Sequence, residues 1–315
     1  MQQVLSIDRV PCGLMLHHFT GPAHPVGQGA LTSDDLNALL LRIGPERFLS
    51  PEEWILRHQQ GLLMPGNLCL TLDDGLRCQF DVALPVLKRH GILAFWFVYS
   101  SVFQGSLERL EVYRYFRTTA FNSIHDFYNA FFEHVMSLDQ DKYTVARASF
   151  RPANYLSEFP FYSSEDRWFR FLRDEYLGQH PYYNVMDQLM DVYGFNPSDA
   201  CQSLWLVDDH LRELSSSGHE IGLHSTTHPT RLSLLDINSQ RHEYTKNYNH
   251  IHQVTGRLPR SMSHPCNSYT SHTLSILRDM NIHLGFRSNM SVLSNPSSLE
   301  LPREDHANLL VLLSS

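Results

Sequence analysis

Short apolar runs alternate along the chain with helical patterns that have clear start and stop signals. This alternation constrains the fold more than any other feature. The apolar runs that read as strands are residues 13–19, 68–72, 93–100, 219–224, 260–264, 283–288 and 299–302. The intervening helices carry start signals, such as the capping box of Thr32 with Asp35 and the pair Ser50–Pro51. Repetition of strand and helix predicts a parallel α/β sheet, either open or closed into a barrel.

Residues 104–206 do not follow this alternation of strands and helices. The block is rich in aromatic residues at helical spacing, as in the stripe of Phe127, Phe131 and Val135. We interpret it as a helical insertion packed on a β/α domain that residues 1–103 and 207–315 form together. Its aromatic stripes favour packing against a core over contact with a ligand. The last eight residues, 308–315, are expected to form a short strand or helix.

Composition excludes several classes of function. A net charge of −8 argues against nucleic acid as a partner, because phosphate binding needs clustered Lys and Arg. No run of about 18 apolar residues is present, so no membrane span is expected. The first residues lack a basic segment followed by a long apolar one, which favours a cytoplasmic protein. The five cysteines are scattered without a C-x-x-C pair, so neither a disulfide framework nor Cys-ligated zinc is expected.

Three polar clusters follow predicted strands. Asp73 and Asp74 come after "LCLTL", His224 and His228 come after "EIGL", and "SHPCNSY" begins at Ser263. On one helical turn, two imidazoles four residues apart face the same way and can share a metal ion. Each cluster alone is also compatible with a turn, a cap or a histidine satisfied in the core. Together they lie at the carboxyl ends of parallel strands, where β/α folds gather their active sites.

The segments "LTLDDG", "HSTTH" and "SHPCNSY", in this order, resemble the first three motifs of the metal-dependent polysaccharide deacetylases, the NodB-homology group. Members of that family have a distorted (β/α) barrel and remove acyl groups, usually N-acetyl, from amino sugars. The resemblance covers residues 13–101 and 206–306 and leaves the helical block outside. It implies Asp73 as the catalytic base and Asp74, His224 and His228 as the ligands of one divalent ion.

Zinc is the expected ion, with cobalt, nickel, manganese and iron as alternatives. The ion would neutralise Asp74 and so allow Asp73 to remain ionised beside it as a base. It would also lower the pKa of a bound water from 15.7 toward about 7, which provides the nucleophile for hydrolysis.

The third motif departs from the family pattern. Members commonly carry Arg-x-Pro there, whereas this chain has His264 before Pro265, with Arg260 and Tyr269 as substitutes by function only. The candidates for substrate or oxyanion contacts are His264, Pro265, Cys266, Asn267, Tyr269, Arg287 and Arg303.

The family's last motif supplies a histidine as general acid. His306, which follows the predicted strand 299–302, is the candidate, with Asp305 as the carboxylate that tunes it. On the first strand, His17 and His18 either face the site or pack in the core, and the core role is the preferred interpretation.

The expected function is removal of an N-acetyl group from an acetamido sugar, in free, nucleotide-linked or lipid-linked form, during cell-surface glycan biosynthesis. The same chemistry would serve a deformylase, an O-deacetylase or a hydrolase of ring amides. A carbohydrate-binding module that kept the fold without turnover is the alternative of a different class. The sequence leaves open whether the chain forms a homo-oligomer.

Overall fold

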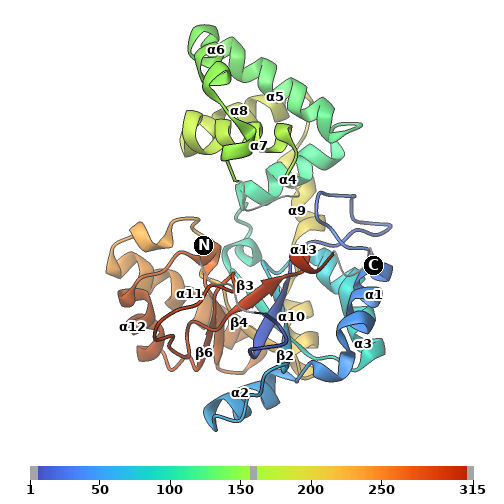
Figure 1. Cartoon of the computed structure of the whole chain (residues 1–315), viewed down its shortest axis with the longest axis vertical. Coiled ribbons are helices and arrows are strands. Elements are labelled where there is room, and N and C mark those ends of the chain that lie inside the picture. Colours follow the sequence, from blue (N-terminus) through green and yellow to red (C-terminus); the bar gives the residue numbers. More distant parts are fainter. Residues whose placement is uncertain (1–5, 157–161, 311–315) are drawn as a thin grey trace. The chain divides into compact units, whose positions relative to one another are not determined.

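The computed structural model describes residues 6–156 and 162–310. The chain divides into two compact units, of which one comprises Met1–Glu108 with Ser203–Ser315 and the other Arg109–Gln202 (Figure 1). The helical unit begins at residue 109 and ends at residue 202, close to the boundaries at 104 and 206 expected from the sequence. Most of the final strand or helix expected at 308–315 lies outside the described residues.

The first unit is built on a parallel sheet with the strand order β6-β5-β4-β3-β2-β1-β7. The strands are β1 (Cys12–Leu16), β2 (Leu68–Asp73), β3 (Ala94–Val98), β4 (Glu220–Leu223), β5 (Ser261–Ser263), β6 (Leu284–Phe286) and β7 (Arg303–Asp305). Every pairing in the sheet is parallel. The predicted α/β class is therefore confirmed, although the last strand begins four residues later than its apolar run.

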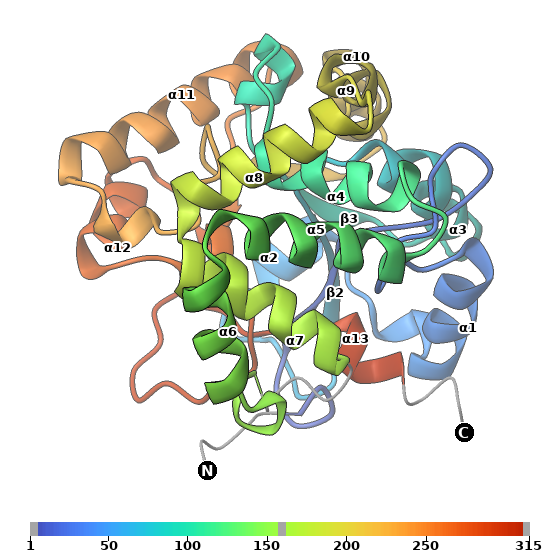
Figure 2. The same ribbon diagram turned by 90° about the horizontal axis from the view of Figure 1, so that it is seen from above.

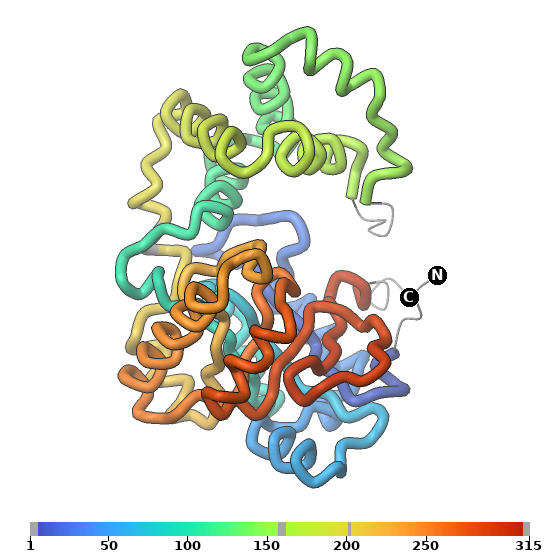
Figure 3. Tube along the Cα trace, turned by 90° about the vertical axis from the view of Figure 1, so that its left-hand side faces the viewer, coloured from blue at the N-terminus to red at the C-terminus, as the bar shows by residue number. Residues whose placement is uncertain are grey.

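The segment before β7 brings the two edges of the sheet together. Leu301 bridges Phe286 of β6 in parallel, and its N–H donates to the carbonyl of Gly285 at 2.8 Å. Since β7 also pairs with β1, the seven strands form a nearly closed barrel, as the predicted deacetylase-type fold requires. Figure 3 traces this unit from the blue N-terminal strand to the red C-terminal segment.

An apolar cluster fills part of the barrel interior. Phe95, Phe97, Leu284 and Phe286 pack there with Trp54 and Ile55 of helix α2 (Pro51–Gln59). Toward the carboxyl ends the interior becomes polar. Burial of an apolar cluster below a polar layer leaves the functional groups at one end of the barrel.

The other helices of this unit surround the sheet. They are α1 (Ser33–Ile43), α3 (Leu84–His90), α10 (Asp208–Ser216), α11 (Ile237–Thr255), α12 (Ser271–Asp279) and α13 (His306–Leu309). The capping box predicted at Thr32 and Asp35 is present, and the Ser50 hydroxyl accepts from the N–H of Glu53 with Pro51 at the first helical position. These caps satisfy N–H groups that a helix start otherwise leaves unpaired.

The second unit is helical, and Figure 2 shows its green to yellow helices from above. It contains α4 (Arg109–Thr119), α5 (Ile124–Leu138), α6 (Gln140–Ser149), α7 (Ser164–Phe171) and α8 (Gln179–Val192), while α9 (Pro197–Leu204) crosses its boundary. The predicted stripe of Phe127, Phe131 and Val135 is fully buried within this unit, and Phe169 of α7 packs on both rings. The aromatic residues therefore form the unit's own core. None of the described helices is long and apolar enough to cross a membrane.

Candidate metal centre

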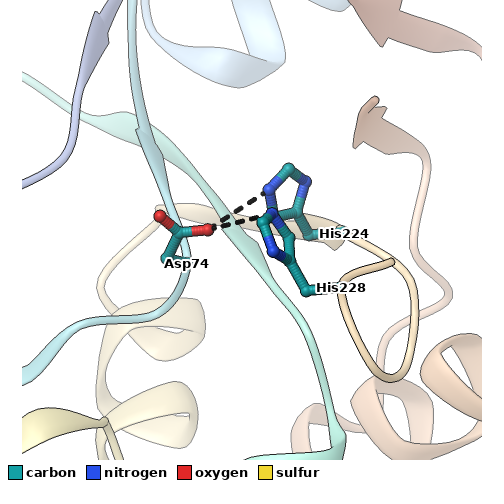
Figure 4. A group of neighbouring side chains, drawn as sticks. All are labelled: Asp74, His224 and His228. Atoms are coloured by element: carbon teal, nitrogen blue, oxygen red, sulfur yellow. Dashed lines mark ion pairs between the residues drawn. The ribbon is translucent and has the colours of Figure 1, made fainter. Parts of the chain in front are cut away.

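Asp74, His224 and His228 converge at the carboxyl ends of β2 and β4. The Oδ1 atom of Asp74 lies 3.4 Å from Nε2 of His224 and 3.5 Å from Nε2 of His228. Figure 4 shows the carboxylate and both imidazoles pointing toward one another. One ligand atom from each residue lies within 4.8 Å of the other two, so the group can hold a metal ion.

The donor set fits a divalent cation. Asp74 Oδ1 is buried and has no well-formed hydrogen bond among the described residues, which is costly for a carboxylate oxygen unless an ion shares its charge. Ligands about 2.1 Å from a tetrahedral zinc ion lie about 3.4 Å apart, which matches the two measured separations. Two imidazoles and one carboxylate also leave a coordination position open, as in hydrolytic sites.

A turn, and not a helix, brings the two histidines together. The expectation that His224 and His228 share a helical turn is wrong, because the chain leaves β4 in an irregular loop. Ser225 has φ 65° and His228 has φ 52°, and Asp74 at the end of β2 has φ 75°. Left-handed backbone is costly for residues with a side chain, so its occurrence at both ligand-bearing loops marks a functional site.

The ring of His224 is oriented by the third motif. Its Nδ1–H donates to the carbonyl of Ser263 at 2.9 Å, which turns Nε2 toward Asp74. Burial alone would lower the pKa of His224, but the hydrogen bond to Asp74, the charges of Asp73 and Asp74 and the Ser263 carbonyl together raise it. The hydrogen bond to Ser263 keeps a proton on Nδ1, so that Nε2 is the nitrogen that can bind a metal ion once the ring is neutral.

The neighbouring carboxylate, Asp73, is held by an arginine. Arg303 donates from Nη1 to Oδ1 and from Nη2 to Oδ2 of Asp73, both at 2.7 Å. The Ser263 hydroxyl also donates to Oδ2, at 3.0 Å. The remaining N–H groups of Arg303 reach the Thr71 hydroxyl, the Ser263 hydroxyl and the carbonyl of Arg287. All five guanidinium N–H groups are thus used, and the side chain is 1% exposed.

This arrangement keeps Asp73 ionised. Burial alone would raise the pKa of Asp73, but the charge of Arg303, the imidazoles of His224 and His17 and the hydrogen bonds from Arg303 lower it below its ordinary value. Arg303 reaches Asp73 across β1, where a Cβ atom at Gly13 would lie 2.9 Å from Arg303 Cγ. Glycine is therefore required at position 13 for the arginine to pass.

His17 lies beside the two carboxylates. Its Nε2 is 3.9 Å from Asp73 Oδ2, and its side chain is 26% exposed, whereas the Asp73 side chain is 4% exposed. The buried amide of Gln79 donates to the backbone carbonyls of both His17 and Asp73, which ties the ends of β1 and β2 together. His17, for which a core role was preferred from the sequence, is a partly exposed imidazole at the site.

The third motif contributes Ser263 to the site, and His264 points elsewhere. His264 is buried, stacks on Tyr269 with ring centroids 4.1 Å apart, and donates from Nε2 to the carbonyl of Leu299 at 2.8 Å. Burial lowers its pKa to about 4, so the ring is neutral at pH 7. These contacts fill its Nε2 position and one ring face with structural partners.

Two other substrate candidates also have structural partners. The Tyr269 hydroxyl donates to Glu300 at 3.1 Å. Arg287 is 3% exposed and binds the carbonyls of Glu300 and Ser291, so it fastens the loop between β6 and β7. Arg303, grouped with them from the sequence, is committed to Asp73. Pro265, Cys266 and Asn267 form a short 3₁₀ turn after β5, in which Cys266 and Asn267 have φ 48° and 55°.

His306, the acid expected from the sequence, begins α13 directly after β7. Its Nε2 donates to the carbonyl of Gly29 at 3.0 Å, and its Nδ1 lies 3.3 Å from Asp305 Oδ1 without a well-formed hydrogen bond among the described residues. The ring is 5% exposed. No contact of His306 with Asp73, Asp74, His224 or His228 occurs in the described structure.

Comparison with known proteins agrees with this geometry. The polysaccharide deacetylase family model matches residues 177–285, which include both histidine ligands. Over this stretch, about a third of its length, the chain is similar to the polysaccharide deacetylase family. Asp73, Asp74 and Arg303 lie outside the matched stretch. None of the curated proteins matches the sequence significantly.

Solved structures of similar fold include deacetylases of low sequence identity. The deacetylase PplD of Streptococcus pyogenes, in complex with acetate, has a TM-score of 0.56 at 15% identity over 94% of this chain and 92% of its own. A de-N-acetylase from Aggregatibacter actinomycetemcomitans has 0.53 at 11%, over 93% of both chains. IcaB from Ammonifex degensii has 0.52 at 13%, over 94% and 91%. At these identities the likeness shows that the chain shares their fold.

Proposed function

We propose that the protein is a metal-dependent hydrolase that removes an N-acetyl group from an acetamido sugar. The observation that carries the proposal is the pair of adjacent carboxylates with different partners: Asp74 faces two imidazoles, and Asp73 is held ionised by Arg303. A binding module needs a metal ligand but has no use for a second, buried carboxylate kept anionic beside it.

A divalent ion at Asp74, His224 and His228, with zinc as the first choice, would lower the pKa of water and polarise an acyl carbonyl. Asp73 would act as the general base, taking a proton from the attacking water, while Arg303 and Ser263 keep its carboxylate in place. His17 would act as the general acid that protonates the leaving amine, because its imidazole is accessible and adjacent to the base.

The family-model match over residues 177–285 supports deacetylation, and the similar structures include a de-N-acetylase and a deacetylase in complex with acetate. We therefore propose an acetamido sugar as substrate, free, nucleotide-linked or lipid-linked, in the assembly of a cell-surface glycan. A cytoplasmic location remains part of this proposal.

Acyl release from matched sugars tests the proposal. Zinc-loaded protein would be incubated with acetamido sugars that are free, nucleotide-linked and oligomeric, together with N-formyl and O-acetyl analogues, and acetate and formate would be measured with the free amine. We expect acetate and amine in equal amounts from an acetamido substrate and no release by Asp73→Asn. Release of formate from the N-formyl analogue alone, or of acetate from the O-acetyl analogue alone, would show that the protein acts on that substrate class and not on acetamido sugars. If no compound released an acid, the proposal of a hydrolase would be contradicted.

A further inference from the structure

The loop that carries His224 and His228 is held by side chains of α11, the helix that follows it. Glu243 accepts from the N–H of Thr226 at 2.9 Å and from the N–H of Thr227 at 2.8 Å, both on Oε2. Its other oxygen, Oε1, accepts from the Thr227 hydroxyl at 2.8 Å. The Thr226 hydroxyl in turn donates to the backbone carbonyl of Glu243 at 2.7 Å. Four hydrogen bonds therefore join one helical residue to the two threonines between the histidines.

One turn further along α11, Asn247 holds the other end of the loop. Its Oδ1 accepts from the backbone N–H of His224 at 2.9 Å, and its Nδ2 donates to the carbonyl of Val98 at the end of β3. Asn247 is fully buried. Because residues four apart lie on the same face of a helix, Glu243 and Asn247 can both hydrogen-bond to the loop, one near its middle and the other at its start.

We propose that Glu243 is a positioning residue for the metal site: it sets the turn that places His228 opposite Asp74. The loop needs such support because Ser225 and His228 both have left-handed backbone, which is costly unless the surroundings impose it. Within the loop, the N–H of His228 donates to the Ser225 hydroxyl at 3.1 Å. The carboxylate of Glu243 fills the gap between them by binding both intervening N–H groups.

The effect on a metal ion follows from this geometry. Without Glu243, the Thr226 and Thr227 N–H groups lose their acceptor, and the turn is free to relax toward ordinary backbone angles. Relaxation moves His228 away from Asp74, while His224 stays fixed through Asn247 and Ser263. Removing outer partners of metal ligands typically weakens metal affinity 10- to 100-fold.

The test is the zinc affinity of the full-length protein, measured by competition with a chromogenic chelator, together with the melting temperature of the metal-free form. We expect Glu243→Ala to weaken zinc binding 10- to 100-fold. Glu243→Gln should stay within about threefold of wild type, because its amide oxygen can accept both N–H groups. Lys246→Ala, an exposed position on the same helix, is the matched control and should be unchanged.

The inference rests on the proposed metal site, and the two fail differently. Wild-type protein that binds no zinc would overturn both. Wild-type protein that binds zinc, with unchanged affinity in Glu243→Ala, would overturn the positioning role alone, even if the variant melted at a lower temperature. Loss of affinity in Glu243→Gln equal to that in Glu243→Ala would also contradict it, since the amide oxygen can still accept from both backbone N–H groups.

Discussion

Arg303 donates a hydrogen bond to each carboxylate oxygen of Asp73, both at 2.7 Å, inside the polar end of the barrel. The two residues are 230 positions apart in the chain and both are almost completely buried. Their pairing explains how two adjacent aspartates end a buried strand: one is compensated by an arginine, and the other faces the candidate metal ligands.

The pairing predicts strong energetic coupling. Arg303→Met leaves the Asp73 charge buried without its partner and should cost about 3–5 kcal/mol of unfolding free energy. The double variant Asp73→Asn/Arg303→Met has no buried charge at either position. The unfolding free energy that it loses should therefore be at least about 1 kcal/mol smaller than the sum of the losses in the two single variants. Urea unfolding of chelator-treated protein measures all four forms. Losses that add within about 0.5 kcal/mol would show that the pair is not coupled.

The identity of the general acid gives a second prediction. His17 lies next to Asp73 and is accessible, whereas His306 binds the carbonyl of Gly29. His17→Ala should therefore lower kcat by about 10²–10⁴-fold, the usual contribution of a general acid. His306→Ala should lower it less than tenfold. The reverse order in steady-state kinetics would return the acid role to His306.

Stability should depend on pH through His219, far from the candidate site. Its Nδ1 accepts from the N–H of Ala94 and from Nε1 of Trp96, and burial lowers its pKa to about 4. The unfolded chain protonates this histidine near 6.5, so between pH 6.5 and 4 the unfolded state binds more protons. The contribution of neutral His219 is complete above pH 6.5 and is lost as the pH falls through this window.

His219→Asn isolates this effect, because its Oδ1 can accept the same two hydrogen bonds without titrating. Between pH 7 and 4, wild-type protein should lose roughly 2–3 kcal/mol more unfolding free energy than the variant. Urea unfolding at a series of pH values provides the measurement. Parallel curves for the two proteins would mean that His219 does not titrate on unfolding.

The sequence predicted that Asp74, His224 and His228 lie together because each cluster follows an apolar strand, and parallel strands present their carboxyl ends together. The same logic could not separate a substrate contact from a structural role for His264. Side chains alternate along a strand, so once Ser263 points into the barrel, its neighbour cannot. Position alone could not decide which of the two faces inward.

The role of Arg303 was beyond sequence reasoning for a different reason. The strand β7 is three residues long and reads Arg-Glu-Asp, without the apolar run that marks a strand. The apolar run before it, 299–302, serves instead to bridge β6 through Leu301. Arg303 thus belongs to a strand that exists only because it pairs with β1. This pairing is a tertiary contact, which the local sequence does not reveal.

Metal content tests the central claim most directly. Mass spectrometry of purified, zinc-reconstituted protein should find about one ion per chain, and none in the variant His224→Ala/His228→Ala. The variant His283→Ala, which removes an exposed histidine elsewhere on the same unit, should keep its ion. Absence of bound metal from wild-type protein, or its retention in the double variant, would contradict a metal site at Asp74, His224 and His228.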